Sequence, residues 1–185
     1  CGCEANTGDG AGIMLQVPHE FFFDECVKMG VHLPAFGKYG VGVLFFPKDI
    51  RLKEECREIF SRCAEHLGLE ILAYRKVPVN PTNIGATALS VEPEIEHVII
   101  ICPDHINDPE AFERKLFVLR NYASHTINST VRKNNVGFYL ASLSYKTIVY
   151  KGQLTSHQVR EYFPDLSNKR MVSAFGLVHS RFATN

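Results

Sequence analysis

The sequence predicts an α+β fold in which helices and sheets stack in layers around a shared core. In the first hundred residues, strand-like apolar runs alternate with stretches whose apolar residues recur at helical spacing. After a long helical stretch, two β-rich runs follow each other with no helix between them, as in an antiparallel pair. A length of 185 residues with 45% hydrophobic residues is typical of one globular domain. We therefore expect a layered α+β sandwich.

The first half of the chain alternates predicted strands and helices. Strands are expected at residues 11–17, 39–46, 69–77 and 96–102. Pro18 opens a helix that Gly30 ends, and residues 50–67 form a second helix that is closed by Gly68. Residues 80–83 (Asn-Pro-Thr-Asn) interrupt the chain, and residues 85–91 are compatible with a helical turn.

The second half begins with a long helix and then becomes β-rich. The helix starts at residues 108–110 (Asp-Pro-Glu), and one apolar face continues through Phe112, Leu116, Leu119, Ala123 and Ile127. Residues 137–143 and 147–151 are expected to form a hairpin. Thr155 caps a short helix over residues 155–163. The last strand is expected at residues 173–182, and its apolar run indicates that it is buried.

The charge balance and the apolar runs disfavour several classes of partner. Twenty basic residues match twenty acidic ones, so no net field favours nucleic acid or an anionic membrane surface. The longest apolar runs, residues 41–46 and 98–102, are far shorter than the roughly 20 residues of a membrane helix. The sequence shows no leader-type segment before the fold, although a chain that begins at Cys1 could have lost one. We expect a cytoplasmic protein with neither nucleic acid nor membrane as a partner.

The six cysteines do not form a recognisable framework. They lack a Cys-x-x-Cys pair and are diluted through a long chain, which argues against a disulfide scaffold. Cys56, Cys63 and Cys102 lie in apolar patterns and are expected to be buried free thiols. Cys1 and Cys3 could supply half of a metal site, but no second pair stands at ligand spacing, so we expect no metal.

A glycine-rich run, residues 7–13 (Thr-Gly-Asp-Gly-Ala-Gly-Ile), leads into the first strand. It enters a strand rather than a helix, so it is neither a Walker loop nor a dinucleotide fingerprint. Glycine allows close backbone approach, which serves either a structural turn or a loop that lines a ligand. The residues alone leave both interpretations open.

The chain ends on a compact polar motif, residues 179–185 (His-Ser-Arg-Phe-Ala-Thr-Asn). An arginine that ends a buried strand needs a partner, and a carboxylate is the natural one because the guanidinium forks onto two oxygens. Arg181 could therefore make an internal salt bridge or bind a substrate carboxylate. His179 is compatible with a packed, hydrogen-bonded side chain or with a catalyst.

Six motifs in order resemble the amino-terminal glutaminase domain of the glutamate synthase large subunit, and the resemblance covers essentially the whole chain. They are residues 7–13 followed by 18–22 (Pro-His-Glu-Phe-Phe), 74–79 (Tyr-Arg-Lys-Val-Pro-Val), 139–144 (Tyr-Leu-Ala-Ser-Leu-Ser), 148–152 (Ile-Val-Tyr-Lys-Gly), 162–166 (Tyr-Phe-Pro-Asp-Leu) and 179–185. The resemblance implies a class II glutamine amidotransferase with a four-layer αββα N-terminal-nucleophile hydrolase fold.

In such enzymes an N-terminal cysteine thiolate attacks the glutamine side-chain amide, and its own α-amino group shuttles the proton. The resemblance implies that Arg181 binds the α-carboxylate of glutamine and that Thr184 lines the same pocket. It places residues 9–13 beside that pocket. It also implies that the ammonia travels to a synthase domain elsewhere in the parent enzyme, which carries FMN and an iron–sulfur cluster and converts 2-oxoglutarate to glutamate. This segment itself is expected to hold no cofactor, and an electron-donating subunit or ferredoxin is the expected partner.

The resemblance departs from the family at both ends of the chain. The nucleophile of the family stands several tens of residues before the Thr-Gly-Asp-Gly-Ala-Gly run, whereas Cys1 stands six residues before Thr7. We therefore expect Cys1 not to be the nucleophile, which would lie upstream. The oxyanion-hole Asn-Gly and an acidic residue would follow Asn185. The domain, residues 1–185, is expected to be partial and the segment inactive, because oxyanion donors alone contribute about 10²–10³ in rate.

Two alternatives remain from the sequence. One is a non-catalytic module that binds glutamine or glutamate, or serves assembly, on the same fold. The other is a compact amidase in which Cys1 is the nucleophile.

Overall fold

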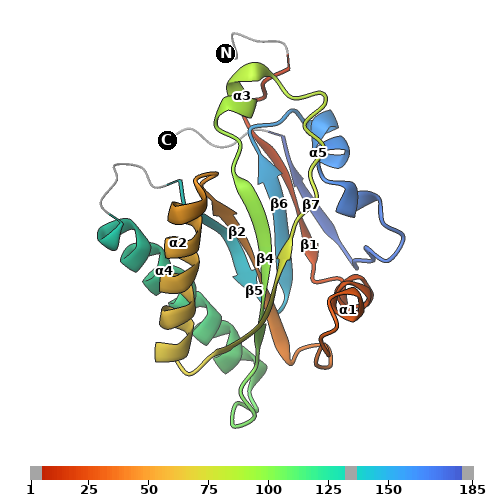
Figure 1. Ribbon diagram of the computed structural model, residues 1–185. Helices are drawn as coiled ribbons and strands as arrows, with labels where there is room; N and C mark the ends of the chain where they lie inside the picture. Colours follow the sequence, from red (N-terminus) through yellow and green to blue (C-terminus); the bar gives the residue numbers. More distant parts are fainter. Residues whose placement is uncertain (1–5, 132–136, 181–185) are drawn as a thin grey trace.

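The computed structural model describes residues 6–131 and 137–180 as an α+β fold with two antiparallel sheets (Figure 1). The strands are β1 (Ala11–Gln16), β2 (Tyr39–Phe46), β3 (Glu70–Lys76), β4 (Glu94–Ile101), β5 (Tyr139–Ser144), β6 (Thr147–Gly152) and β7 (Gly176–His179). The helices are α1 (His19–Lys28), α2 (Ile50–His66), α3 (Ala86–Ser90), α4 (Pro109–Thr130) and α5 (Ser156–Tyr162), with a 3-10 helix η1 (Pro164–Ser167). The predicted α+β class is confirmed.

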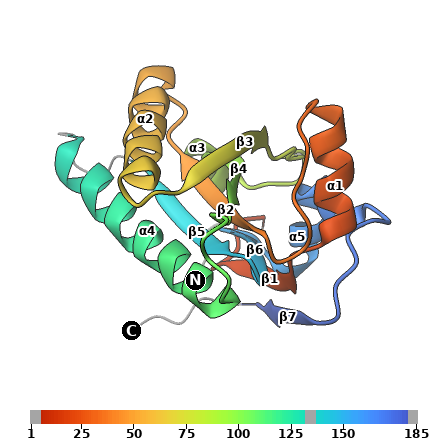
Figure 2. The same ribbon diagram turned by 90° about the horizontal axis from the view of Figure 1, so that it is seen from below.

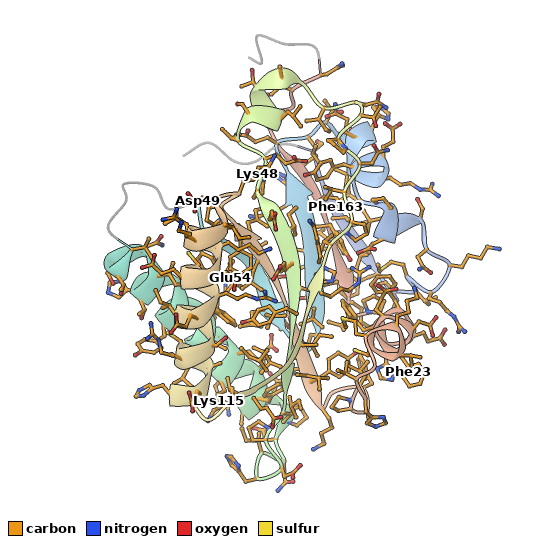
Figure 3. The ribbon with its side chains drawn as sticks, in the orientation of Figure 1. Phe23, Lys48, Asp49, Glu54, Lys115 and Phe163 are labelled. Atoms are coloured by element: carbon orange, nitrogen blue, oxygen red, sulfur yellow. The ribbon has the colours of Figure 1, made fainter. Side chains whose placement is uncertain are left out.

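Four strands form the larger sheet in the order β3-β4-β2-β5, and helices α2 and α4 cover its outer face. Both helices begin at an aspartate, Asp49 and Asp108, whose side chain accepts hydrogen bonds from backbone N–H groups of the first turn. Figure 3 shows Asp49 at the start of α2. The predicted apolar face of α4, from Phe112 to Ile127, is buried against this sheet. The helix pair and the outer face together enclose one hydrophobic core.

Strands β6, β1 and β7 form the smaller sheet, in that order. Its inner face packs against the inner face of the larger sheet through residues such as Leu15, Ile148 and Val41. Helices α1 and α5 lie beside the two sheets, on the side away from α2 and α4 (Figures 1 and 2). Phe21 and Phe22 of α1 and Phe163, which follows α5, are fully buried in this second core. Two sheets are therefore joined by a single inner layer of apolar side chains.

The prediction of a hairpin at residues 137–151 is wrong. Strands β5 and β6 are joined by a tight turn, but β5 pairs with β2 and β6 pairs with β1, in different sheets. The turn is held by Glu113, whose carboxylate accepts hydrogen bonds from the Ser144 hydroxyl at 2.6 Å and the Tyr145 N–H at 3.1 Å. The Ser144 oxygen also accepts from Lys146 and Thr147 backbone N–H groups. These side-chain oxygens satisfy the backbone N–H groups of the turn. The two strands therefore need not pair with each other, and each pairs with a strand that is distant in sequence.

The prediction of a buried last strand is also wrong for the residues described. Strand β7 is shorter than expected, and all four of its residues are exposed, with Leu177 at 61% and Val178 at 66%. Among the residues that the structure describes, it lies at the edge of the smaller sheet and pairs with β1. An edge strand has one free backbone edge, so an apolar sequence alone does not determine burial.

Within residues 6–131 and 137–180, no helix has the length and apolar character needed to cross a membrane.

Candidate functional site

Three strand ends meet at one end of the smaller sheet. Ala11, at the start of β1, pairs with Gly152 at the end of β6. Gly12 pairs with His179 at the end of β7. The glycine-rich start of the chain therefore lies between the end of β6 and the end of β7, which are about 10 Å apart at ordinary strand spacing. This end of the sheet is where the polar motif that begins at His179 leaves β7.

The glycines of residues 7–13 lie against protein backbone. A Cβ atom on Gly8 would stand 2.1 Å from the carbonyl carbon of Leu154 and 2.4 Å from the backbone nitrogen of Thr155. A Cβ atom on Gly12 would stand 2.7 Å from the Lys151 side chain. Gly10 has a φ of 118°, which disfavours L side chains. Of the two interpretations left open by the sequence, these contacts favour the structural turn.

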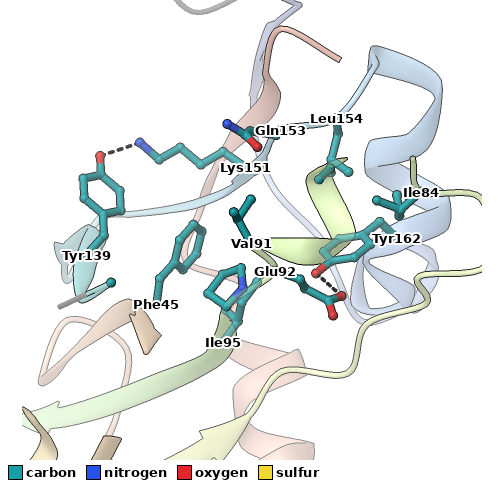
Figure 4. Close-up of a pocket in the computed structure, with 14 residues that line it drawn as sticks. Phe45, Ile84, Val91, Glu92, Ile95, Tyr139, Lys151, Gln153, Leu154 and Tyr162 are labelled. Atoms are coloured by element: carbon teal, nitrogen blue, oxygen red, sulfur yellow. Dashed lines mark hydrogen bonds between the residues drawn. The ribbon is translucent and has the colours of Figure 1, made fainter. Parts of the chain in front are cut away.

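A pocket with a volume of about 260 Å³ opens at the same end of the molecule (Figure 4). Its walls are mainly apolar and come from β2, α3, β4 and the segment after β6, with Phe45, Val91 and Leu154 among them. Two polar pairs flank it: Tyr162 donates a hydrogen bond to Glu92 at 2.8 Å, and Lys151 donates to the Tyr139 hydroxyl. Both carboxylate oxygens of Glu92 have partners, because Lys48 binds the second one. The pocket presents an apolar surface without a nucleophile and its base.

A buried ionic cluster lies deeper, between the sheets and α1. The Arg75 guanidinium on β3 donates to both oxygens of Asp165 at 2.7 and 2.8 Å and, through Nε, to Glu25 at 2.6 Å. Tyr150 on β6 donates to the same Asp165 carboxylate at 3.2 Å. His97 Nδ1 on β4 lies 3.4 Å from the Arg75 Nη1 atom. Five elements, β3, α1, η1, β6 and β4, therefore meet at one guanidinium.

Burial shifts the protonation of the groups around Arg75. Burial and then the charge of Arg75 lower the pKa of His97 well below its usual value, so the ring is neutral. With Nδ1 facing Arg75, the proton lies on Nε2, which is buried and has no hydrogen-bond partner within the described residues. Burial, followed by the charge of Asp165, raises the pKa of Tyr150 well above its usual value. His97 and Tyr150 therefore stay neutral near pH 7, and their contacts stabilise the fold.

The cysteines that the structure describes are poor nucleophiles. Cys26, Cys56, Cys63 and Cys102 are free and buried, which confirms the prediction made for the last three. Burial, followed by a neighbouring glutamate charge, raises the pKa of Cys26 and that of Cys56 to about 11. Because the thiolate is the attacking species, neither is suited to covalent catalysis near neutral pH.

The predicted site residues fall largely outside the described part of the chain. Arg181, Thr184 and Cys1 lie in residues 181–185 and 1–5, of which the structure describes nothing. His179 is described and is exposed at the end of β7. Within residues 6–131 and 137–180, no group of three or more His, Cys, Asp or Glu side chains could hold a metal ion.

Comparison with protein families identifies the family of the chain. Residues 1–185 match the family described as class II glutamine amidotransferases. The chain belongs to this family. Its mixed α+β architecture with antiparallel sheets agrees with membership of the class II amidotransferases.

The most similar relatives found are glutamate synthases. The chain is 42% identical over 189 residues to glutamate synthase [NADH] of Schizosaccharomyces pombe, and 41% identical over 184 residues to the glutamate synthase [NADPH] large chain of Bacillus subtilis. It is 34% identical over 187 residues to the chloroplastic ferredoxin-dependent glutamate synthase 2 of Arabidopsis thaliana. Each match covers 100% of this chain but only 9%, 12% and 11% of the relative. The chain thus spans about a tenth of the length of these relatives.

Three of the motifs that carried the resemblance meet in the buried cluster. Arg75 belongs to residues 74–79, Tyr150 to residues 148–152 and Asp165 to residues 162–166, and their side chains bond to one another. The resemblance implied no role for these three side chains. One signal was present: an arginine on a strand and an aspartate between Pro164 and Leu166 are charges in apolar surroundings, which require a partner when buried.

Proposed function

We propose that this chain is part of the glutaminase domain of a glutamate synthase and contributes half of its glutamine site. In the intact enzyme the domain hydrolyses L-glutamine to L-glutamate and ammonia. The observation that carries the proposal is the class II amidotransferase match over residues 1–185, together with the three relatives reported above, each of which is named a glutamate synthase. The ammonia then serves the reductive amination of 2-oxoglutarate in another part of the enzyme.

In this proposal Arg181 binds the α-carboxylate of glutamine and Thr184 lines the same pocket. A guanidinium fits this task because its N–H donors match two carboxylate oxygens in one plane. The position of β7 supports the assignment: the chain leaves it at His179, two residues before Arg181, beside the glycine-rich start of β1. The threonine hydroxyl supplies a further hydrogen-bonding group for the zwitterionic substrate.

The covalent step is assigned to a cysteine that lies upstream of Cys1 in the complete polypeptide. Its thiolate attacks the side-chain amide carbon of glutamine, the C–N bond breaks, and ammonia leaves with a proton from the α-amino group. Water then cleaves the thioester and releases glutamate. The buried cysteines 26, 56, 63 and 102 have raised pKa values and take no part.

The remaining features of the whole enzyme are proposals of the same kind. FMN and an iron–sulfur cluster would be held elsewhere in the polypeptide. The electron donor could be a nicotinamide-dependent subunit or ferredoxin, since the relatives' names include NADH, NADPH and ferredoxin. We further propose that residues 1–185 form one partial domain, which the rest of the polypeptide completes into a four-layer αββα sandwich. A cytoplasmic location is proposed from the resemblance, and cell fractionation tests it.

Steady-state kinetics of the complete polypeptide test the role of Arg181. Arg181→Ala is expected to raise the KM for glutamine by about 100-fold, which corresponds to about 2.7 kcal/mol of lost binding, within the range of a buried charged contact. Arg62→Ala, which removes a guanidinium that is 65% exposed on α2, serves as the matched control and should leave KM unchanged. An unchanged KM for Arg181→Ala would overturn the assignment.

The 185-residue chain itself tests the assignment of the nucleophile. Incubated with glutamine, it is expected to release neither glutamate nor ammonia. Turnover that Cys1→Ala abolishes would show that Cys1 is the nucleophile after all. Saturable glutamine binding by the complete polypeptide without turnover would instead indicate a non-catalytic binding module.

A further inference from the structure

The Arg75 cluster holds two segments that lead to the proposed glutamine site. Through Asp165 it holds η1, the 3-10 helix from which the chain runs to β7. Through Glu25 it holds helix α1. Arg75 is 8% exposed and Asp165 is 4% exposed, so water competes little for these bonds. A planar guanidinium with bidentate bonds to one carboxylate and a third bond to another fixes both partners in distance and in angle.

The charges of this cluster balance, which makes its burial tolerable. Lys28 binds Glu25 at 2.6 Å, so the two carboxylates, Glu25 and Asp165, face one guanidinium and one ammonium. Burial opposes the ionised form of Glu25, but the hydrogen bonds from Lys28 and Arg75 outweigh it and lower the pKa of its carboxyl. Removing either charge of the buried Arg75–Asp165 pair would leave the other charge buried and less well compensated, which costs more than the loss of an exposed pair.

Residues 168–175, between η1 and β7, are bonded to the same elements. Arg170 donates to Glu20 at 2.8 Å and lies 3.4 Å from Asp24, both on α1. The Ser173 hydroxyl accepts a hydrogen bond from the backbone N–H of Gln16, at the end of β1, at 2.8 Å. The segment therefore rests on α1, which is held both by its buried Phe21 and Phe22 and by the bond between Glu25 and Arg75.

Strand β7 has little burial of its own to hold it. All four of its residues are exposed, so its placement depends on backbone pairing with β1 and on the segment that precedes it. Burial of apolar side chains, the term that holds most strands, contributes little here. A shift of η1 would therefore pass through residues 168–175 to His179 and onward, since no buried side chain of β7 opposes it.

We propose that Arg75 is a positioning residue for glutamine binding, which acts through Asp165 and Glu25 on the segment that carries Arg181. The inference rests on the proposed role of Arg181. Arg75 does not contact the substrate; it fixes the two elements from which β7 is held. Misplacement of a group in an active site by about 1 Å can lower the reaction rate by up to about 100-fold.

Kinetics of the complete polypeptide with a matched control test the proposal. Asp165→Asn and Arg75→Lys each remove the bidentate pair, and each is expected to raise the KM for glutamine by about 10-fold while kcat changes less than 2-fold. The control is Glu96→Gln, which removes the charge of a carboxylate that is as buried as Asp165 and that pairs with Lys53 and Arg57 on the opposite face of the larger sheet. It is expected to lower stability and leave KM unchanged.

Hydrogen exchange of the same variants supplies a second measurement. Amides of residues 171–180 should exchange at least 10-fold faster in Asp165→Asn than in the parent, whereas those of α4 should not change. The proposal is overturned if the folded Asp165→Asn and Arg75→Lys variants keep the parental KM, or if Glu96→Gln raises it equally. Arg181→Ala separates the two levels: if it leaves KM unchanged, the glutamine assignment fails, and if it alone raises KM, only the positioning role fails.

Discussion

Substitution of Gly8 by alanine tests whether the glycine-rich run is a structural turn. The added Cβ would lie 2.1 Å from the Leu154 carbonyl carbon, and ordinary contact begins at 3.4 Å. The backbone must therefore separate by about 1.3 Å at Leu154, which precedes Thr155, the residue that caps α5. Overpacking of this kind destabilises a protein by about 1–3 kcal/mol. The clash here is with backbone, which can move less than a side chain, so we expect a destabilisation in the upper half of that range. For a chain of this size, about 2 kcal/mol lowers Tm by about 4–8 °C.

The assay is urea denaturation of the 185-residue chain, with Gly176→Ala as the matched control. Gly176 also lies in the smaller sheet, but its added Cβ would meet Leu15 and Ile13 side chains at 3.5 and 3.6 Å, which is ordinary contact. Gly176→Ala should be neutral or slightly stabilising, because alanine loses less backbone entropy on folding. Equal stability of the two variants would refute the structural interpretation. A loss of glutamine binding in the complete polypeptide at unchanged stability would favour a ligand-lining loop instead.

Three further predictions concern buried or half-buried side chains. Because the native pKa of His97 lies below the unfolded value near 6.5, the unfolded chain binds the extra proton. Stability should therefore fall as pH drops below about 6.5, by up to about 1.4 kcal/mol per pH unit. In urea denaturation at pH 7, 6 and 5, His97→Phe should lose this part of the pH dependence of the unfolding free energy. The same pH dependence in parent and variant would contradict the prediction. At pH 8 a Cys26 thiol with a pKa of about 11 is about 0.1% thiolate, so peptide mapping should find it alkylated only after unfolding. Glu113→Ala should cost about 1–3 kcal/mol by leaving the β5–β6 turn without its acceptor, whereas exposed Glu110→Ala should leave the urea midpoint nearly unchanged in the same denaturation experiment.

The sequence predicted the elements well where local signals are strong. The signals for α2 and α4 are local in sequence. They are an aspartate at the start of each helix, Gly68 after α2 and the apolar face of α4, and both helices form as expected. The prediction of buried thiols held for the same reason, since Cys56 and Cys63 lie on an apolar helix face. Local propensity and burial pattern agree at these positions, so no distant residue is needed to decide them.

The errors arose where partners are distant in sequence. Residues 139–152 have the pattern of a hairpin, yet β5 pairs with Val41 to Phe45 and β6 with β1, more than a hundred residues upstream of it. Alternation cannot distinguish a neighbouring strand from a distant one, because both satisfy the same backbone groups. The apolar sequence of β7 predicts burial, but which strand ends at a sheet edge is decided by the topology of the whole fold.

Two arginines show which parts of the site the sequence reveals. Arg181 is conspicuous because it stands in a compact polar motif, and the resemblance gives it a substrate carboxylate as partner. Arg75 stands in an ordinary strand, and its partner Asp165 lies 90 residues away. A guanidinium needs a carboxylate partner wherever it is buried. The sequence does not show whether a single strand residue such as Arg75 is buried, so it did not predict that Arg75 has such a partner. Asp165 lies in η1, from which the chain continues to β7. In the proposed positioning role, Arg75 therefore influences where Arg181 lies. The double variant Asp165→Asn with Arg181→Ala should then be no worse for glutamine KM than Arg181→Ala alone, since a misplaced guanidinium and an absent one lose the same bond.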